Sequence, residues 1–259
     1  MPILRRISIA PVKSLALQHP TEVELTARGV AGDRRFYLAD PWGRLVTGSA
    51  HGPLVQVASS YDPDGDLLEL RFPDGTTVGG PGAPSGQPVQ TDFYGRPVQS
   101  HVVEGPFAEA LSAYAGRPIR LVRVDREGDG TDVHHLTLVS AESVAELGRR
   151  AGRQDDPDAR RFRMLLEIEG CAEPHEEDTW DGLAVRVGAA TVRIAGRVPR
   201  CVVTTQHPAT GLRDLDTLRT INRYRGVMDD DGDRGLPFGM YAEVETPGVA
   251  RVGDRVEPG

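Results

Sequence analysis

Hydrophobic and polar residues alternate with a period of two along much of the chain. Clear cases are residues 21–27 (TEVELTA), 67–72 (LLELRF) and 183–196 (LAVRVGAATVRIAG). A period of two buries one face of a strand and leaves the other in solvent. Because such segments recur from residue 3 to the C-terminus, separated by glycine and proline, we predict a strand-dominated α+β protein. Its architecture is expected to be two β-barrel-like units with a few helices.

Three segments have the spacing of an amphipathic helix instead. They are residues 107–116, 140–152 and 212–226. Gly116 is expected to end the first helix, and Ser140 to cap the start of the second. These segments are the predicted helices. Hairpin turns are expected at Tyr94-Gly95 and near Gly188.

A polar run near the middle of the chain separates the two predicted units. The strand at residues 117–124 is expected to close the first unit, and the run DREGDGTD then leads into the second. We therefore divide the chain into residues 1–122 and 123–259. The glycine- and proline-rich residues 79–88 are predicted to form a loop, and residues 198–211 a strand that ends in a turn.

The overall charge excludes some function classes. The net charge is −8 and the pI is about 5.4, which argues against a general nucleic-acid-binding protein. No window approaches the ~20 apolar residues of a membrane span, and the N-terminus lacks the apolar stretch of a signal peptide. Cys171 and Cys201, the two cysteines, cannot form a disulfide scaffold. We expect a cytoplasmic protein.

The basic residues are almost all arginines. Of the 30 lysines and arginines, Lys13 alone is a lysine. A lysine retained in such a chain can mark a place where a compact ammonium group is needed and a planar guanidinium does not fit. Composition by itself leaves chance as an equal alternative.

The residues around Cys201 favour a reactive thiol. Cys201 follows Val198, Pro199 and Arg200. A neighbouring guanidinium stabilises a thiolate, which suits a nucleophile or a ligand of a soft metal. The alternative is a buried, inert cysteine. Cys171 has no activating neighbour in the sequence, and we interpret it as structural.

Two clusters of arginine are candidates for anion binding. On a strand, Arg161 and Arg163 would share one face, and paired guanidinium groups suit a phosphate. The alternative for this cluster, which includes Arg160, is a solvated face balanced by the nearby aspartates. For the second cluster, Arg34 and Arg35, a surface role is the default.

Other polar motifs carry weaker signals. His134 and His135 are expected on opposite faces of a strand, so at most one would face a ligand and a zinc site is improbable. The acidic residues 229–233 lack the final glutamate of a calcium loop, because position 240 is Met240. We interpret that run as an exposed loop. Residues 176–178 could supply an acid or base, although capping is the more common use.

The order of these motifs is more specific than any one of them. The N-terminal half contains PVKS at residues 11–14, ELTARGVAGDRRFYLAD at 24–40 and then GRLVT. The C-terminal half contains HLTLVSAESVAELG at 135–148, RFR, PRC and finally FGMYAEVETPG. In this order the chain resembles the MOSC family, in particular the two-part members that include the mitochondrial amidoxime-reducing component and its bacterial relatives. The similarity covers nearly all 259 residues.

The resemblance implies a molybdenum cofactor (Mo-molybdopterin) bound between a MOSC N-terminal β-barrel domain and a MOSC domain, and no pyridoxal phosphate. The molybdenum ligand of the family falls on Cys201. The other cofactor contacts that the resemblance implies fall on Lys13, Ser14, Arg34, Arg163, Pro199 (through its backbone) and Arg200, with His134 at a position near the phosphate.

Some positions depart from the family pattern. Leu165 replaces an asparagine that contacts the cofactor in the family, and leucine cannot donate a hydrogen bond. Residues 48–51 (GSAH) lack an expected arginine, and Val133 and His134 stand where small hydroxyl residues are expected. The resemblance therefore implies cofactor binding that is weaker or differently arranged.

The function implied is a reductase of N-oxygenated compounds, with a small-molecule substrate. Two cysteines are too few for an iron–sulfur cluster, so a separate ferredoxin- or flavin-type donor is expected to supply electrons. No nucleic acid or membrane partner is expected. Two alternatives stay open: a sulfur carrier or transferase that uses a Cys201 persulfide, and a diverged, non-catalytic cofactor-binding protein.

Overall fold

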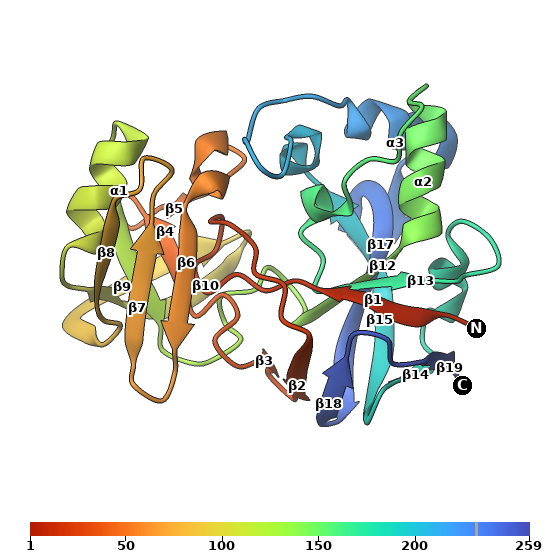
Figure 1. Ribbon diagram of the computed structural model, residues 1–259, viewed down its shortest axis with the longest axis horizontal. Coiled ribbons are helices and arrows are strands. Elements are labelled where there is room, and N and C mark those ends of the chain that lie inside the picture. The colour runs from red at the N-terminus through yellow and green to blue at the C-terminus, as the bar shows by residue number, and fades with distance from the viewer. Residues whose placement is uncertain (231–232) are drawn as a thin grey trace.

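The computed structural model describes residues 1–230 and 233–259 and shows two units side by side (Figure 1). The first unit contains β4 to β11 and the helix α1. The second contains most of the remaining strands, both other α-helices of the described residues, and the two chain termini. The predicted strand-dominated α+β class is confirmed.

The first unit is built from antiparallel sheets. One sheet has the order β5-β4-β11-β10-β9 and the other the order β6-β7-β8, with α1 packed beside β8 and β11. The elements are β4 (Phe36–Ala39), β5 (Leu45–Val46), the 3-10 helix η1 (Gly52–Gln56), β6 (Ala58–Asp62), β7 (Leu67–Arg71), β8 (Thr77–Pro81), β9 (Pro84–Phe93), β10 (Arg96–Val103), α1 (Phe107–Ala115) and β11 (Arg120–Val124).

The second unit is a nearly closed barrel. Its main sheet has the order β1-β13-β12-β17-β15-β14-β19, and a bridge between Ile3 and Arg255 links the two ends. The strands are β1 (Ile3–Ile7), β12 (Leu136–Ser140), β13 (Leu166–Glu169), β14 (Ala184–Val187), β15 (Ala190–Arg200), β16 (Met228–Asp230), β17 (Asp233–Thr246) and β19 (Val256–Pro258). The helices are α2 (Ala141–Arg150), η2 (Ala159–Phe162), η3 (Glu176–Trp180), η4 (Val202–Thr205) and α3 (Thr217–Arg225).

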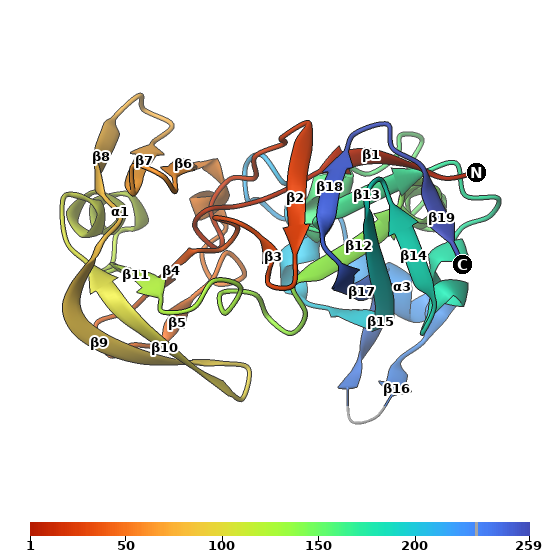
Figure 2. The ribbon, with the colours of Figure 1, turned by 90° about the horizontal axis from the view of Figure 1, so that it is seen from below.

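The N-terminal segment belongs to the core of the second unit. β1 pairs with β13, and β2 (Glu22–Thr26) lies between β3 (Gly29–Val30) and β18 (Gly248–Arg251), as Figure 2 shows. The side chains of these first strands pack with those of β12 to β18 in one hydrophobic cluster. The chain therefore starts in the second unit, builds the first and returns. The division at residue 122 stays a prediction.

Turns and caps read from the sequence agree with the structure. Tyr94 and Gly95 connect β9 to β10, and Gly188 lies in the turn between β14 and β15. Gly116 ends α1 in the left-handed conformation, and the Ser140 side chain accepts a hydrogen bond from the Ser143 amide at the start of α2. These predictions are confirmed. The sequence could make them because each feature depends on local backbone conformation.

Three local predictions are wrong. Residues 84–88 belong to β9 instead of a loop, and their prolines are tolerated because β9 is an edge strand. Residues 202–205 form η4 instead of a strand, with the Thr204 and Thr205 hydroxyls donating to the carbonyl oxygens of Cys201 and Val202. Residues 159–162 form the 3-10 helix η2 instead of the strand on which Arg161 was expected.

The acidic run at 229–233 lies partly in the hairpin of β16 and β17, and its residues 231 and 232 lie outside the described residues. No helix in the described part of the chain is both long and apolar enough to cross a membrane.

Candidate functional site

A pocket between the two units collects the predicted site residues. Its wall includes all eight residues that the family resemblance nominated: Lys13, Ser14, Arg34, His134, Arg163, Pro199, Arg200 and Cys201. These residues are up to 188 positions apart in the chain. The structure thus brings together every one of them, although their roles stay predictions. Arg35 and residues 176–178, which were also candidates, do not line it.

Lys13 forms the cationic floor of this pocket. Its side chain is almost fully buried, and Nζ donates to the Gly130 carbonyl at 3.0 Å and to Asp132 Oδ1 at 2.6 Å. Burial lowers the pKa of Lys13, the charge of Asp132 opposes that shift, and Arg34 adds to it. Asp132, which the sequence did not nominate, partly neutralises a cluster of positive charges.

A hydrogen bond joins Arg34 to Arg163, which lies 129 positions further along the chain. Arg34 Nη2 donates to the Arg163 carbonyl at 3.1 Å, and Arg163 Nη2 donates to the Leu15 carbonyl at 2.7 Å. Arg34 is also paired with Asp33. Burial, and then the charge of Arg34, lower the pKa of Arg163 to about 10. The guanidinium of Arg163 is thus held in an environment that favours a bound anion.

Two guanidinium groups of the pocket have no carboxylate partner among the described residues. Arg163 donates to a carbonyl, and Arg200 donates to the Phe162 carbonyl and to Met164 Sδ at 3.2 Å. The buried Nε of Arg200 has no hydrogen-bond partner. A half-buried cation without a counter-ion is unfavourable, so these groups suit a ligand that carries negative charge.

The backbone is strained around the same pocket. Ser14, Arg34, Tyr94 and Arg163 have positive φ angles of 77°, 50°, 56° and 54°. Non-glycine residues rarely adopt this conformation, and such residues cluster at functional sites. All four of these residues line the pocket.

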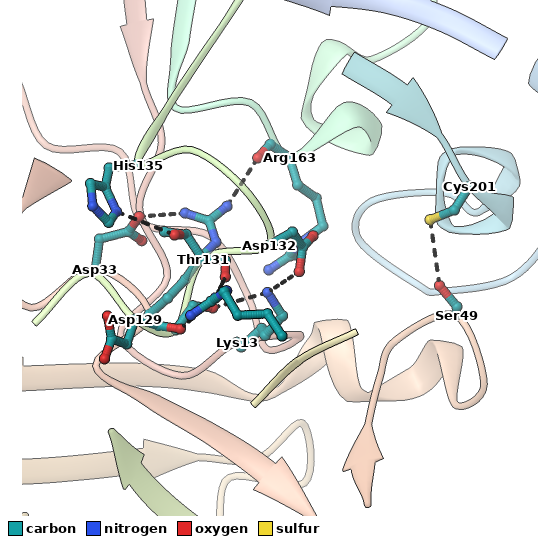
Figure 3. Close-up of polar contacts among 12 residues, drawn as sticks. Lys13, Asp33, Ser49, Asp129, Thr131, Asp132, His135, Arg163 and Cys201 are labelled. Carbon is teal, nitrogen blue, oxygen red and sulfur yellow. Dashed lines mark hydrogen bonds and ion pairs between the residues drawn. The ribbon is translucent and has the colours of Figure 1, made fainter. Parts of the chain in front are cut away.

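Cys201 lies at the opposite side of the pocket from the Lys13 cluster (Figure 3). It follows the last residue of β15, begins η4, and is exposed. Its Sγ is 3.8 Å from the hydroxyl of Ser49, a residue of the first unit. The thiol is therefore accessible, whereas Cys171 is buried and burial raises the pKa of that thiol to about 12. Cys171 packs in the hydrophobic core of the second unit, which agrees with its interpretation as a structural residue.

The prediction that Arg161 and Arg163 share one face is wrong. Arg161 is in η2, and Arg163 follows it in the left-handed conformation, so their side chains diverge. The buried Arg161 donates to the Thr204 carbonyl at 3.1 Å and pairs with both oxygens of Asp214. Arg161 therefore anchors the segment that follows Cys201. Arg160 pairs with Asp158, as the solvated-face alternative anticipated.

Both histidines line the pocket, and the expectation that at most one of them would face a ligand stays a prediction. They precede β12 instead of lying within a strand. His134 Nδ1 lies 2.9 Å from Glu243 Oε1, and its ring centroid is 5.0 Å from that of Tyr241. His135 Nδ1 lies 3.3 Å from the Thr131 hydroxyl.

Leu165 does not line the pocket. Its side chain is buried in the hydrophobic core of the second unit, and Met164 lines the pocket instead. Gly48 and Ser49 of the segment at residues 48–51 line the pocket. Gln206 Nε2 donates a hydrogen bond to the Gly48 carbonyl at 3.0 Å.

Sequence reasoning missed several residues of the pocket wall, among them Ser49, Tyr94, Asp132, Gln206 and Tyr241. Only Tyr94 carried a local signal, because it stands before a glycine at a predicted hairpin turn. The others are recognisable only from their positions in space.

Comparison with known families matches both halves of the chain. Residues 1–116 match the MOSC N-terminal beta barrel domain, and residues 125–257 match the MOSC domain. The mitochondrial amidoxime-reducing component 1 of Xenopus laevis is 27% identical over 285 residues, covering 98% of this chain and 81% of that protein. A molybdenum cofactor sulfurase of Drosophila willistoni is 26% identical over 254 residues, covering 93% of this chain and 31% of that protein.

Among solved structures, the YUAD protein from Bacillus subtilis aligns with a TM-score of 0.44 and 13% identity, covering 100% of this chain and 96% of that one.

Proposed function

This chain belongs to the MOSC family, and from that premise we propose that it binds a molybdenum cofactor and reduces N-oxygenated compounds. The observation that carries the proposal is the pocket between the units, where an exposed thiol faces a buried cationic cluster. Its relatives include proteins named as amidoxime-reducing components, which supports an enzymatic role.

The residues present fit a phosphate-bearing pterin cofactor. Lys13, Arg34 and Arg163 would hold its phosphate, since the guanidinium of Arg163 has no carboxylate partner in the described chain. Arg200, with an unpartnered buried Nε, and the backbone of Pro199 would contact the pterin. Charge-assisted donors of this kind bind phosphate and carbonyl oxygens well.

Cys201 would supply the protein sulfur ligand of the metal. Its exposure leaves the sulfur accessible, and Arg200 lies beside it in the chain and in the pocket wall. When bound, the cofactor supplies the two-electron chemistry that removes oxygen from nitrogen. The protein binds and orients both ligands. His134, whose Nδ1 is engaged by Glu243, has Nε2 available to hold a proton or a polar group of a ligand.

The electrons would come from a separate ferredoxin- or flavin-type protein. The chain has two cysteines, one buried and one committed to the pocket, which is too few for an iron–sulfur cluster. The exposed thiol side of the pocket is where reducible substrates would enter.

A second candidate is sulfur transfer. The similarity to a protein named molybdenum cofactor sulfurase, together with the exposed Cys201 thiol, favours it as the alternative. In that case Cys201 would hold a persulfide and pass its outer sulfur to an acceptor.

The variant Cys201→Ala separates these functions, with Cys171→Ala as the matched control. We expect wild-type protein from a cofactor-replete host to contain molybdenum by elemental analysis, Cys171→Ala to retain it, and Cys201→Ala to lose most of it. Reconstituted wild type should reduce an N-hydroxylated amidine. Protein that lacks molybdenum and carries a mass increase of about 32 Da on Cys201 would instead support sulfur transfer.

A further inference from the structure

An exposed aromatic residue stands at the mouth of the pocket. Tyr94 is 68% exposed and lines the same pocket as Cys201. It lies at the tip of the hairpin of β9 and β10, which extends from the first unit toward the second in Figure 2. Among the exposed large hydrophobic side chains of the described chain, Tyr94 and Val133 are the two that line this pocket.

The backbone conformation of the turn does not favour a tyrosine at position 94. Phe93 pairs with Arg96, so Tyr94 and Gly95 form a two-residue turn in which both φ angles are positive, 56° and 93°. Turns of this type favour asparagine or aspartate before glycine, because a bulky residue is strained in the left-handed conformation. A tyrosine here lowers stability, and its side chain gains nothing from burial.

The residues on either side hold the hairpin tip in place. Phe93 is buried, with its ring edge-on to Tyr37 at 5.0 Å and the Lys13 ammonium 5.3 Å from its centroid. Arg96 Nη2 donates to the carbonyls of Asp129 at 2.9 Å and Thr131 at 2.6 Å. The tip is therefore attached to the loop that precedes β12, and Tyr94 is presented in a defined position.

The surroundings of Tyr94 form an apolar rim over a polar pocket. Val133, 52% exposed, lines the pocket from the attached loop, and Tyr241 lines it from β17. Tyr94 lines the same pocket together with these two residues. A ligand bound at Cys201 would therefore share the pocket with Tyr94 and Val133.

We propose that Tyr94, together with Val133, is a specificity-determining site that binds the planar, aromatic part of the substrate while the N-oxygenated group points to Cys201. This inference rests on the proposed function and names its substrate class. Aromatic rings stack offset or edge-on with a modest gain in binding, so small aliphatic N-oxygenated compounds would bind more weakly.

Tyr94→Asn is the decisive variant. Asparagine suits the left-handed position, so the variant is expected to fold with an equal or higher melting temperature. Calorimetry on the molybdenum-loaded protein would compare benzamidoxime with acetamidoxime, its methyl counterpart. We expect Tyr94→Asn to weaken benzamidoxime binding about three- to tenfold and to leave acetamidoxime binding unchanged. Tyr94→Phe keeps the ring and should retain the wild-type preference.

Trp42→Ala is the matched control, because Trp42 is also an exposed aromatic residue of the first unit and does not line the pocket. It should change neither affinity. Equal affinities for both amidoximes in the wild type, no binding of either, or an equal loss for both in Tyr94→Asn would overturn the inference. Selective binding without reduction would instead contradict the proposed reductase function and leave the binding site supported.

Discussion

Lys13 illustrates how one residue serves the site. Its ammonium donates to the Gly130 carbonyl and to Asp132, and lies over the ring of Phe93. A compact, tetrahedral donor meets these partners in different directions, which a planar guanidinium cannot do. This environment gives a physical reason for a lone lysine in a chain whose other basic residues are arginines.

We expect Lys13→Ala to reduce cofactor retention without unfolding the protein. Loss of a charge-assisted hydrogen bond to phosphate weakens affinity by about tenfold or more. The check is molybdenum content after dialysis, with circular dichroism to confirm folding. Arg44→Ala, at an exposed cation outside the pocket, should retain wild-type content. Unchanged molybdenum in Lys13→Ala would contradict the placement of the phosphate.

Short elements of the second unit depend on contacts that no single element contains. His175 begins η3 with a φ of 65°, and its Nε2 lies 3.2 Å from the Tyr224 hydroxyl of α3. Its ring is also edge-on to Phe238 of β17 at 5.5 Å. One histidine thus joins η3, α3 and the barrel, and its protonation would disturb all three.

The pH dependence of stability follows from this burial. Burial, and then the charge of Arg225, lower the pKa of His175 to about 4, below its ordinary value of 6.5. The unfolded chain therefore binds a proton first as the pH falls, so the free energy of unfolding decreases between pH 6.5 and 4. Above pH 6.5 this contribution is fully present.

We expect His175→Asn to reduce this loss of stability, because asparagine does not titrate and tolerates the left-handed conformation. Urea unfolding at several pH values between 4 and 7 would measure it. His51→Asn, at a half-buried histidine of the first unit, should keep the wild-type slope. Identical slopes for wild type and His175→Asn would show that other groups control acid stability.

At the scale of the molecule, the two units are not independent. The first thirty residues supply Leu4, Ile7, Val23, Leu25 and Val30 to the hydrophobic core of the second unit. Complete burial of each such side chain contributes about 1.5–3 kcal/mol, so together they amount to about 10 kcal/mol. That is comparable with the whole stability of a typical domain.

A fragment of residues 123–259 is accordingly expected not to fold by itself, although it contains the whole MOSC match. It would lack β1, the partner of β13, as well as these core side chains. Circular dichroism melting and limited proteolysis, compared with the full chain, would test this. A cooperative melting transition for the fragment would contradict the expectation.

The sequence by itself determined the features that depend on neighbours in the chain. Alternation along 21–27 and 183–196 predicted strands, and Gly116 and Ser140 predicted the helix ends. The order of the motifs also predicted Lys13, Arg34, Arg163 and Cys201 as site residues, because a family pattern preserves spacing along the chain. Local geometry is sufficient for predictions of this kind.

Only the tertiary structure decided which distant groups meet. Asp132 reaches Lys13 across 119 positions, and Ser49 reaches Cys201 across 152. Arg161 turns away from Arg163 because a 3-10 turn replaces the expected strand. Such contacts depend on how sheets and loops pack in space, and the period of a single segment contains no information about its partners.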